Sequence, residues 1–464
     1  MILKGSNKKQ VYDKNRFVEI KEAKALLEQK EKRQKRMQMI EVQTGLSSKE
    51  ITARIKEINE KGLFKITAYL YWKWDMHRLE DAALEELLAL MARRKKLKTQ
   101  ASKKHMQVDD GQLEVAALEE DVLQCNAINQ QMLSKAMIDN MVEAWKIHDH
   151  YWKDEEDLTK LVVDMETMNI LFDYTYEEYL SFDFQEKSLE ERLTYLSGKE
   201  RKKVLLSIND EAASDLFHDK HQTYCKYEKY FRREQACVYD EEDFQAFQQF
   251  CKKHPVFVKK PLVSYKGRGV EPIRLDGSED LQAVMSRLVE ENGPFVVEEL
   301  IETHDGMKAM NPDSVNTVRV ETFYNQGNPV IATGFMRVGK AGHFVDNGSA
   351  GGIIIPIHME SGILTAIGRD KTNVTYTAHP DTGITFDGYQ IPKWNDLVKL
   401  SKKLALMTPE VPYIGWDFTL NTKGKWVIVE GNARPGGFGN QRSSGRGMRR
   451  EFFDTIGKNP NQFK

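Results

Sequence analysis

The most informative stretch of this sequence is a pair of apolar segments that carry hard oxygen ligands. Segments 416–420 and 426–432 have strand character and flank a short polar turn; the first contains Asp417 and the second contains Glu430 and Asn432. Residues two apart on a strand share a face, and Asp417 can lie opposite them across a hairpin. Two carboxylates and an amide oxygen on one face suit Mg²⁺. The stretch is therefore a magnesium site or an ordinary hairpin with two exposed acids.

A basic glycine loop precedes this hairpin. A short strand, predicted over 256–261, carries Lys260 near its end and runs into a loop with Gly267, Arg268 and Gly269. Glycines let backbone amides approach a phosphate, and basic side chains add charge. No Gly-Lys-Ser/Thr sequence closes the loop at the start of a helix, so it is not a P-loop. It is either a surface hairpin loop or, together with the Lys260 ammonium, a polyphosphate-binding loop.

A later apolar strand, predicted over 295–301, carries two acids, Glu298 and Glu299, before Leu300 and Ile301. A strand-to-loop segment of this kind can offer backbone carbonyl and amide groups to an adenine ring. Asp305, four residues past Ile301, is a candidate partner for ribose hydroxyls.

Two arginines stand inside apolar strands farther along the chain, at Arg319 and Arg337. Burial of an unpaired charge is costly, so each arginine needs an anionic partner. Arginine binds phosphate or carboxylate through two parallel hydrogen bonds. The partner is therefore a substrate anion or, in the structural alternative, an acid of the protein itself.

Composition sets bounds around these residues. The 464 residues predict two or three domains, and a net charge of -2 gives no general attraction to nucleic acid or anionic membranes. Cys125, Cys225, Cys237 and Cys251 lack metal-ligand spacing and are too few for a disulfide framework, which indicates thiols in a reducing compartment. We expect no signal peptide and no membrane span, and hence a cytoplasmic protein.

The chain divides by texture into regions that must position these residues. Residues 1–150 are poor in Gly and Pro and predict a helical region, with helices over 67–98 and 112–148. Residues 151–245 are also mostly helical by pattern. From Pro255 onward, strands interleave with a few helices, which predicts an α+β region.

The order of the motifs resembles the ATP-grasp superfamily, and more closely its sugar-transfer-associated branch, which includes enzymes linked to polysaccharide and teichuronopeptide synthesis. The resemblance covers about residues 150–460 and leaves residues 1–150 outside. Its motifs, in chain order, are Asp219-Lys220, Phe257-Val258-Lys259-Lys260-Pro261, Gly267-Arg268-Gly269-Val270, Val297-Glu298-Glu299-Leu300-Ile301, Ser314-Val315-Asn316-Thr317-Val318-Arg319, Asp346-Asn347-Gly348-Ser349-Ala350-Gly351-Gly352, His379-Pro380-Asp381-Thr382-Gly383, Gly415-Trp416-Asp417 and Glu430-Gly431-Asn432.

The resemblance implies an α+β fold in which two α+β subdomains clamp ATP, preceded by a mostly helical N-terminal region. Residues 151–245 would form a mostly helical region before the clamp. Residues 246–312 would form the first subdomain, with the nucleotide lid and hinge. Residues 313–464 would form the second, with the metal and the substrate.

The resemblance also implies roles for individual residues. The doubled Lys259-Lys260 leaves the phosphate lysine open by one position, and we choose Lys260 because it immediately precedes Pro261. No close Glu follows His304-Asp305, so the ribose assignment departs from the family pattern. The implied residues are Lys220, Lys260, Gly267, Arg268, Gly269, Glu298, Glu299, Leu300, Ile301 and Asp305 for ATP, Arg319 and Arg337 for the phosphates or the acyl phosphate, and Asp417, Glu430 and Asn432 for one or two Mg²⁺ ions, which Mn²⁺ can replace.

ATP-grasp enzymes mostly transfer the γ-phosphoryl group to a carboxylate, and an amine then attacks the acyl phosphate to give an amide. The resemblance therefore implies a carboxylate–amine ligase acting on a cell-envelope glycan, a peptide or a small amino acid. One alternative is an ATP-grasp kinase that phosphorylates a hydroxyl. Another is a non-catalytic nucleotide-binding scaffold, with residues 1–150 as the surface for a helical partner or a homo-oligomer.

Overall fold

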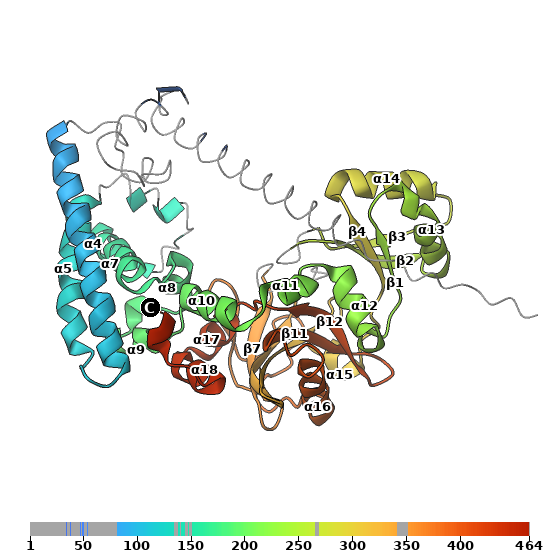
Figure 1. Ribbon diagram of the computed structural model, residues 1–464. Helices are drawn as coiled ribbons and strands as arrows, with labels where there is room; N and C mark the ends of the chain where they lie inside the picture. The colour runs from blue at the N-terminus through green and yellow to red at the C-terminus, as the bar shows by residue number, and fades with distance from the viewer. Residues whose placement is uncertain are drawn as a thin grey trace, which may run out of the picture. The chain divides into compact units, whose positions relative to one another are not determined.

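The computed structural model of the protein describes residues 34, 38, 47, 49, 50, 53, 81–133, 138, 139, 141–143, 147, 151–264, 269–340 and 351–463. Two compact units divide the chain, one up to Leu180 and one from Ser181 to Phe463. Figure 1 shows the helices and strands of both units. Within the described part of the chain, none of the helices combines the length and the apolarity that a membrane crossing requires.

The first unit is helical. Its long helices are α4 (Asp81–Asp109), α5 (Ala116–Met132) and α7 (Glu155–Phe172), and α8 (Tyr176–Ser181) follows. The helical character expected of residues 1–150 is therefore confirmed where the structure describes them. Helix α5 ends at Met132, because Leu133 has extended backbone, whereas the periodicity predicted a helix up to residue 148. The expected helix over 67–98 is described only from Asp81 onward.

Short helices open the second unit and others surround its sheets. The Asp210 and Asp219 side chains accept hydrogen bonds from backbone amides at the starts of α11 and α12, as expected of N-cap residues. The helices of this kind are α9 (Leu189–Leu193), α10 (Gly198–Ile208), α11 (Glu211–Ser214), α12 (Lys220–Phe231), α15 (Asp305–Lys308), α17 (Phe438–Ser444) and α18 (Arg449–Ile456), with 3₁₀ turns at Phe184–Glu186, Asp215–Phe217, Glu241–Asp243 and Pro460–Phe463.

The smaller of two antiparallel sheets has four strands in the order β1-β4-β2-β3. Helices α13 and α14 cover one face of it, and their apolar residues pack with those of the strands into one core (Figure 1). The predicted strand over 256–261 is confirmed, whereas the strand predicted over 295–301 ends at Glu299. The elements are β1 (Gln235–Val238), β2 (Val256–Pro261), β3 (Glu271–Arg274), β4 (Phe295–Glu299), α13 (Phe244–Lys253) and α14 (Leu281–Asn292).

The larger sheet has eight strands, in the order β10-β9-β7-β6-β5-β11-β12 with β8 paired to β7. Its β5–β6 hairpin turns through Gln326 and Gly327, both at positive φ (45° and 92°), as a two-residue hairpin turn requires. The strands are β5 (Thr317–Asn325), β6 (Asn328–Val338), β7 (Ile353–His358), β8 (Ile363–Leu364), β9 (Gly368–Arg369), β10 (Thr375–Tyr376), β11 (Tyr413–Leu420) and β12 (Trp426–Asn432).

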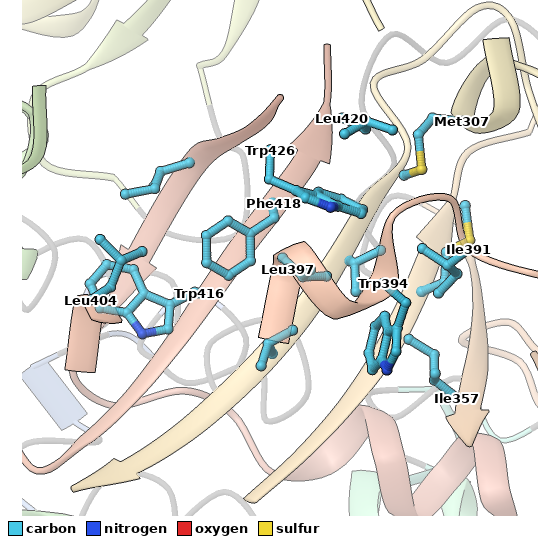
Figure 2. Close-up of a cluster of buried hydrophobic side chains, with 14 of the residues drawn as sticks. Met307, Ile357, Ile391, Trp394, Leu397, Leu404, Trp416, Phe418, Leu420 and Trp426 are labelled. Carbon is cyan, nitrogen blue, oxygen red and sulfur yellow. The ribbon is translucent and has the colours of Figure 1, made fainter. Parts of the chain in front are cut away.

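Strand alternation separates an apolar face of this sheet from a polar one. Trp416, Phe418 and Leu420 of β11 are buried in the main core with α16 (Trp394–Ala405), as Figure 2 shows. Asp417 lies between them in sequence and therefore faces the other side. The mixed helix and sheet content confirms the predicted α+β class. The large core thus covers one face of the sheet, and the candidate site lies on the opposite face.

Candidate functional site

A cavity of about 130 Å³ is lined by residues from both sheets of the second unit and from α12. Apolar residues such as Phe217, Phe231 and Val270 form part of its wall. Convergent polar groups within a partly apolar wall are typical of ligand sites. Six residues predicted from the sequence line this cavity, namely Lys220, Lys260, Glu298, Arg337, Asp417 and Glu430.

Lys260, and not Lys259, is the lysine of β2 that lines the cavity. The Lys260 Nζ lies 2.7 Å from Glu298 Oε2. Lys259 points to the opposite face, where its side chain is fully buried and its Nζ lies 2.7 Å from Glu271 Oε1. The Lys259 Nζ also donates to the Gly269 carbonyl at 3.3 Å. The two lysines thus lie on opposite faces of β2, as side chains alternate along a strand, and contact of Lys260 with phosphate stays a prediction.

Lys220 reaches the cavity from the first turn of α12. The buried Asp219 side chain begins this helix by accepting the amides of His221 and Gln222, at 2.8 and 3.0 Å. The Lys220 Nζ donates to Ser264 Oγ at 3.1 Å, at the end of the segment that follows β2. Two ammonium groups, from α12 and from β2, therefore line the same cavity.

The predicted glycine loop is described only at its end. Gly267 and Arg268 lie outside the described residues. Gly269 has a φ of 71°, in the left-handed region that favours glycine, and Val270 beside it lines the cavity. The end of the loop therefore lies at the cavity wall, and the role of the loop as a lid stays a prediction.

Glu298 is a fully buried acid that holds the cavity wall together. Lys260 and Arg233 each place a nitrogen 2.7 Å from Glu298 Oε2, and Gln235 Nε2 donates to Oε1 at 3.0 Å. Burial raises the pKa of Glu298, but the two cations outweigh it and lower the pKa to about 2. The ionised Glu298 side chain thus holds Lys260 in place through an ion pair.

The backbone around Glu298 pairs with neighbouring strands on both sides. Glu298 pairs with Gln235 on one side and with Val258 on the other. Leu300 and Ile301 come after the end of β4, at the connection to the larger sheet. If this segment meets adenine as the sequence predicts, the contact lies at Leu300 and Ile301 rather than at Glu298.

The remaining two residues predicted for the nucleotide lie elsewhere. Glu299 accepts the Glu234 amide at 3.1 Å with its carboxylate and is not among the described residues that line the cavity. Asp305 is exposed at the start of α15, and it too is absent from the described cavity wall. The ribose contact of Asp305, which already departed from the family pattern, stays a prediction that no geometry in the second unit supports.

Asp417 is buried between the two strand arginines. Arg319 donates Nε to Oδ1 at 2.5 Å and Nη2 to Oδ2 at 2.9 Å, and Arg337 Nη2 lies 2.6 Å from Oδ1. Both arginines thus form ion pairs with an acid of the protein itself, which was the structural alternative to a substrate anion. Arg337 also lines the cavity, where its Nε donates to Thr317 Oγ1 at 3.1 Å, whereas Arg319 is not among the described residues of the wall. Contact of either with a phosphate stays a prediction.

The β11–β12 hairpin sets Asp417 directly opposite Glu430, and Gly415 opposite Asn432. The register shifts between Asp417 and Phe418, which leaves Val429 as an extra residue just before Glu430. Bulges of this kind re-aim side chains and are common beside active sites. Asp417 and Glu430 line the cavity, while Asn432 is not among its described lining residues.

The donor set of this hairpin fits Mg²⁺. Glu430 and Asn432 are partly exposed and bring hard oxygens. Asp417 Oδ2 accepts a hydrogen bond from Arg319, and a carboxylate oxygen has two acceptor sites. The described residues hold no group of three or more His, Cys, Asp or Glu side chains placed for a metal. The triad contains only two such side chains and an amide, so the magnesium assignment stays a prediction.

Arg233 is a site residue that the sequence analysis missed. It donates to the Ile428 carbonyl at 2.5 Å and to the Val429 carbonyl at 3.4 Å, next to the bulge, while it binds Glu298 in the smaller sheet. It therefore joins the wall that carries Lys260 to the strand that carries Glu430. In the sequence it stands in an Arg-Arg pair with the pattern of a solvated charge, so no local signal identifies it.

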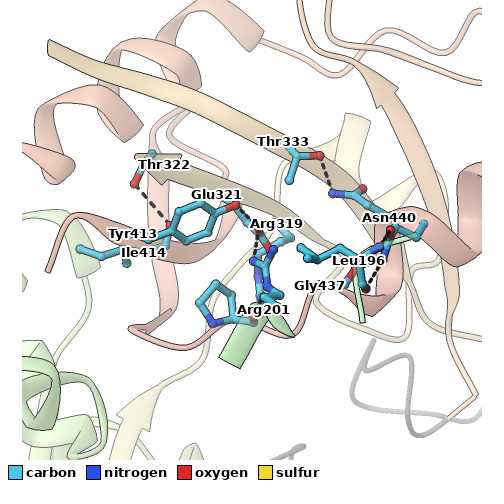
Figure 3. A network of polar contacts seen from close by, with 12 residues as sticks. Leu196, Arg201, Arg319, Glu321, Thr322, Thr333, Tyr413, Ile414, Gly437 and Asn440 are labelled. Carbon is cyan, nitrogen blue, oxygen red and sulfur yellow. Dashed lines mark hydrogen bonds and ion pairs between the residues drawn. The ribbon is translucent and has the colours of Figure 1, made fainter. Parts of the chain in front are cut away.

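A second buried network continues the polar face of the larger sheet (Figure 3). Arg201 of α10 lies 2.7 Å from Glu321 Oε2, and the Tyr413 hydroxyl donates to the same oxygen at 2.7 Å. Arg201 Nε also donates to the Pro435 carbonyl at 3.0 Å. Glu321 is two residues from Arg319 and shares its face. The network fixes α10 and the segment after β12 beside the candidate site.

Because Asp417 and Glu298 are buried and ionised, we expect low pH to destabilise the second unit. The pKa of Asp417 and that of Glu298 are both lowered to about 2 in the folded chain, from ordinary values of 3.8 and 4.5, against the effect of burial. A depressed pKa stabilises the fold above the ordinary value, and that stability is lost as pH falls toward the folded value. At about 1.4 kcal/mol per pKa unit, each acid contributes on the order of 2–4 kcal/mol.

Urea unfolding at pH 6, 5, 4 and 3 measures this effect. We expect the free energy of unfolding to fall from about pH 5 to the lowest pH measured, because the loss continues down to the folded pKa of about 2. The variant Asp417→Asn lacks one of the two groups, so its curve should be flatter over the same interval. An equal slope in the variant and the native chain would contradict the contribution of Asp417.

A family model described as sugar-transfer associated ATP-grasp matches residues 199–457, which is more than half of the chain. No curated protein sequence matches this chain. Similar solved structures include D-alanyl-alanine synthetase A from Vibrio cholerae O1 biovar eltor, with 11% identity over 55% of this chain and 65% of that one and a TM-score of 0.34.

Two further solved structures are similar at the same level. The ATP-grasp ligase PsnB, complexed with its minimal precursor, has 15% identity over 54% of this chain and 62% of that one, with a TM-score of 0.33. VanG D-Ala:D-Ser ligase from Enterococcus faecalis has 12% identity over 55% and 62%, with a TM-score of 0.34. The chain spans slightly less than two thirds of the length of each of these proteins.

Proposed function

The chain belongs to the sugar-transfer-associated ATP-grasp family, and from this we propose that it is an ATP- and Mg²⁺-dependent ligase that joins a carboxylate to an amine. The observation that carries the proposal is the cavity that Lys220, Lys260 and Arg337 line together with Asp417 and Glu430. Cations and hard oxygen ligands around one cavity suit a polyphosphate with its metal.

In the proposed reaction, a carboxylate oxygen of the substrate attacks the γ-phosphorus of ATP and ADP leaves. The amine then attacks the carbonyl carbon of the acyl phosphate, and phosphate leaves as the amide forms. Lys220 and Lys260 bind and orient the phosphates, and Arg337 neutralises the charge that spreads over the transferred group. Glu298 and Asp417 hold Lys260 and Arg337 in place. Mg²⁺, held by Asp417, Glu430 and Asn432, would neutralise phosphate charge when bound.

We place the substrates of this reaction in cell-envelope polysaccharide or peptide, in line with the sugar-transfer description of the family. A screen of ADP release across amino acids, short peptides and acidic sugars, each with and without an amine, tests the reaction class. ADP release that needs both a carboxylate and an amine supports the ligase. A stable phosphorylated product without an amine identifies a kinase instead, and Mg-ATP binding without turnover of any compound identifies a scaffold.

The two adjacent lysines of β2 give a matched pair of variants for the nucleotide site. Lys260→Met removes an ammonium from the cavity, and we expect Mg-ATP binding to weaken about 10–150-fold, which corresponds to a charged hydrogen bond of about 1.5–3 kcal/mol. Lys259→Met removes an ammonium from the opposite face and should change binding less than about threefold.

Titration calorimetry with Mg-ATP measures both affinities, and thermal unfolding reports whether either variant has lost stability. The half-exposed Glu271 loses its partner in Lys259→Met, so that variant controls for the loss of a buried lysine. Equal weakening in the two variants would contradict the assignment of Lys260.

A further inference from the structure

One of the four cysteines differs from the others in its surroundings. Cys125, Cys237 and Cys251 are buried, and burial raises the pKa of each thiol, to about 11 for Cys125 and about 12 for Cys251. Such thiols are inert. Cys225 is exposed on α12, the helix that begins with Lys220. Its accessibility makes it the one described cysteine that a solute can reach.

Cys225 is paired with a histidine one helical turn earlier. His221 and Cys225 are four residues apart and share a face of α12, with the Sγ 3.6 Å from His221 Nε2. The other ring nitrogen, Nδ1, lies 2.9 Å from Gln235 Oε1 on β1. The ring also stacks on Tyr224, with centroids 6.5 Å apart and an interplanar angle of 12°. The imidazole is therefore held on both edges and on one face.

The hydrogen-bond chain determines which nitrogen of His221 carries the proton. Glu298 is an ionised acid and can only accept, so Gln235 must turn its amide nitrogen toward it, at 3.0 Å. The Gln235 carbonyl oxygen then faces His221 and also only accepts. Nδ1 of the neutral ring consequently carries the hydrogen, and Nε2 presents a lone pair to the Cys225 thiol. This is the arrangement of a thiol with a positioned base.

We propose that Cys225 is a modification site for low-molecular-weight disulfides, activated by His221 and connected through Gln235 and Glu298 to the candidate nucleotide cavity. His221 Nε2 takes the thiol proton, and the Cys225 thiolate attacks one sulfur of the disulfide. A bond forms between Sγ and that sulfur, the original disulfide bond breaks, and the second sulfur leaves as a thiolate, so no further oxidant is needed.

The chain from Cys225 ends on a residue that the cavity shares. Glu298 binds Gln235 through Oε1 and Lys260 through Oε2. A mixed disulfide at Cys225 removes the thiol from His221 and adds a group to α12, the helix that begins with Lys220. Modification should therefore weaken Mg-ATP binding, an effect that rests on the proposed function, whereas the reactivity of the thiol does not.

The reaction is tested with 5,5′-dithiobis(2-nitrobenzoic acid) on the full chain. We expect one thiol per native chain to react at least as fast as the thiols of the urea-unfolded chain, and Cys225→Ser to remove this fast phase alone. His221→Ala should slow it about tenfold, and so should Gln235→Met, which leaves His221 and Cys225 in place. Exposure alone would leave the rate unchanged in Gln235→Met. An unchanged rate in both variants, or a fast phase that survives in Cys225→Ser, would overturn the proposal.

The connection to the cavity is tested by Mg-ATP calorimetry before and after reaction with the same disulfide. Binding should weaken in the native chain and stay unchanged in Cys225→Ser. Equal affinity before and after modification would refute the connection. If untreated protein does not bind Mg-ATP at all, the proposed function fails while the thiol kinetics still decide the modification site.

Discussion

Replacing Glu430 with alanine is expected to reduce ATP turnover by about 10²–10³-fold, the usual loss when one charge-stabilising group is removed from an active site. Glu430 lines the cavity directly opposite Asp417, and the register places no other carboxylate of β12 at this position. Its side chain is partly exposed and is not part of the apolar core. The free energy of unfolding should therefore change by no more than about 1 kcal/mol.

ADP release at saturating ATP measures the loss, with Mg²⁺ varied to separate a metal effect from an ATP effect. Glu360→Ala removes an exposed acid of the same sheet region and serves as the matched control, with turnover expected at the native level. Asn432→Ala should fall between the two if the amide is a third ligand. Near-normal turnover in Glu430→Ala would defeat the magnesium assignment.

Local periodicity was enough to predict the parts of the site that lie on one strand or one hairpin. Asp417 opposite Glu430, and the opposite directions of Lys259 and Lys260, both follow from the alternation of side chains along a strand. The choice of Lys260 needed more than alternation, since only the packing of α13 and α14 decides which face of β2 is covered.

The sequence pattern could not predict which residues far apart in the chain contact each other. Arg319 and Arg337 were predicted to have an anionic partner, but pairing across β5, β6 and β11 was needed to show that both meet Asp417. Arg233 gave no signal at all, because its ligands are backbone carbonyls of β12 and an acid of β4. His221 and Cys225 share a helix face that spacing could have shown, whereas the role of Gln235 depends on the β1–β4 pairing.

Replacing Asp417 with alanine is expected to destabilise the second unit by about 3–5 kcal/mol, the range for a buried ion pair that loses one partner. Asp417 is 2% exposed and is shared by Arg319 and Arg337, so its removal leaves two buried guanidinium groups without their common carboxylate. Urea unfolding measures the loss. Asp387→Ala, an exposed acid in the same part of the chain, should change the free energy of unfolding by less than about 0.5 kcal/mol.

The double variant Asp417→Ala, Arg319→Met separates lost pairing from lost packing. If the cost of Asp417→Ala arises from uncompensated charge, removing Arg319 as well should restore part of the stability, because an apolar side chain of similar length needs no counter-charge. If the cost arises from packing, the two losses should add. Turnover should stay low in both variants, because Arg337 would still lack the carboxylate that holds it at the cavity. Recovered turnover in the double variant would show that Asp417 only neutralises Arg319 and has no part in binding the metal.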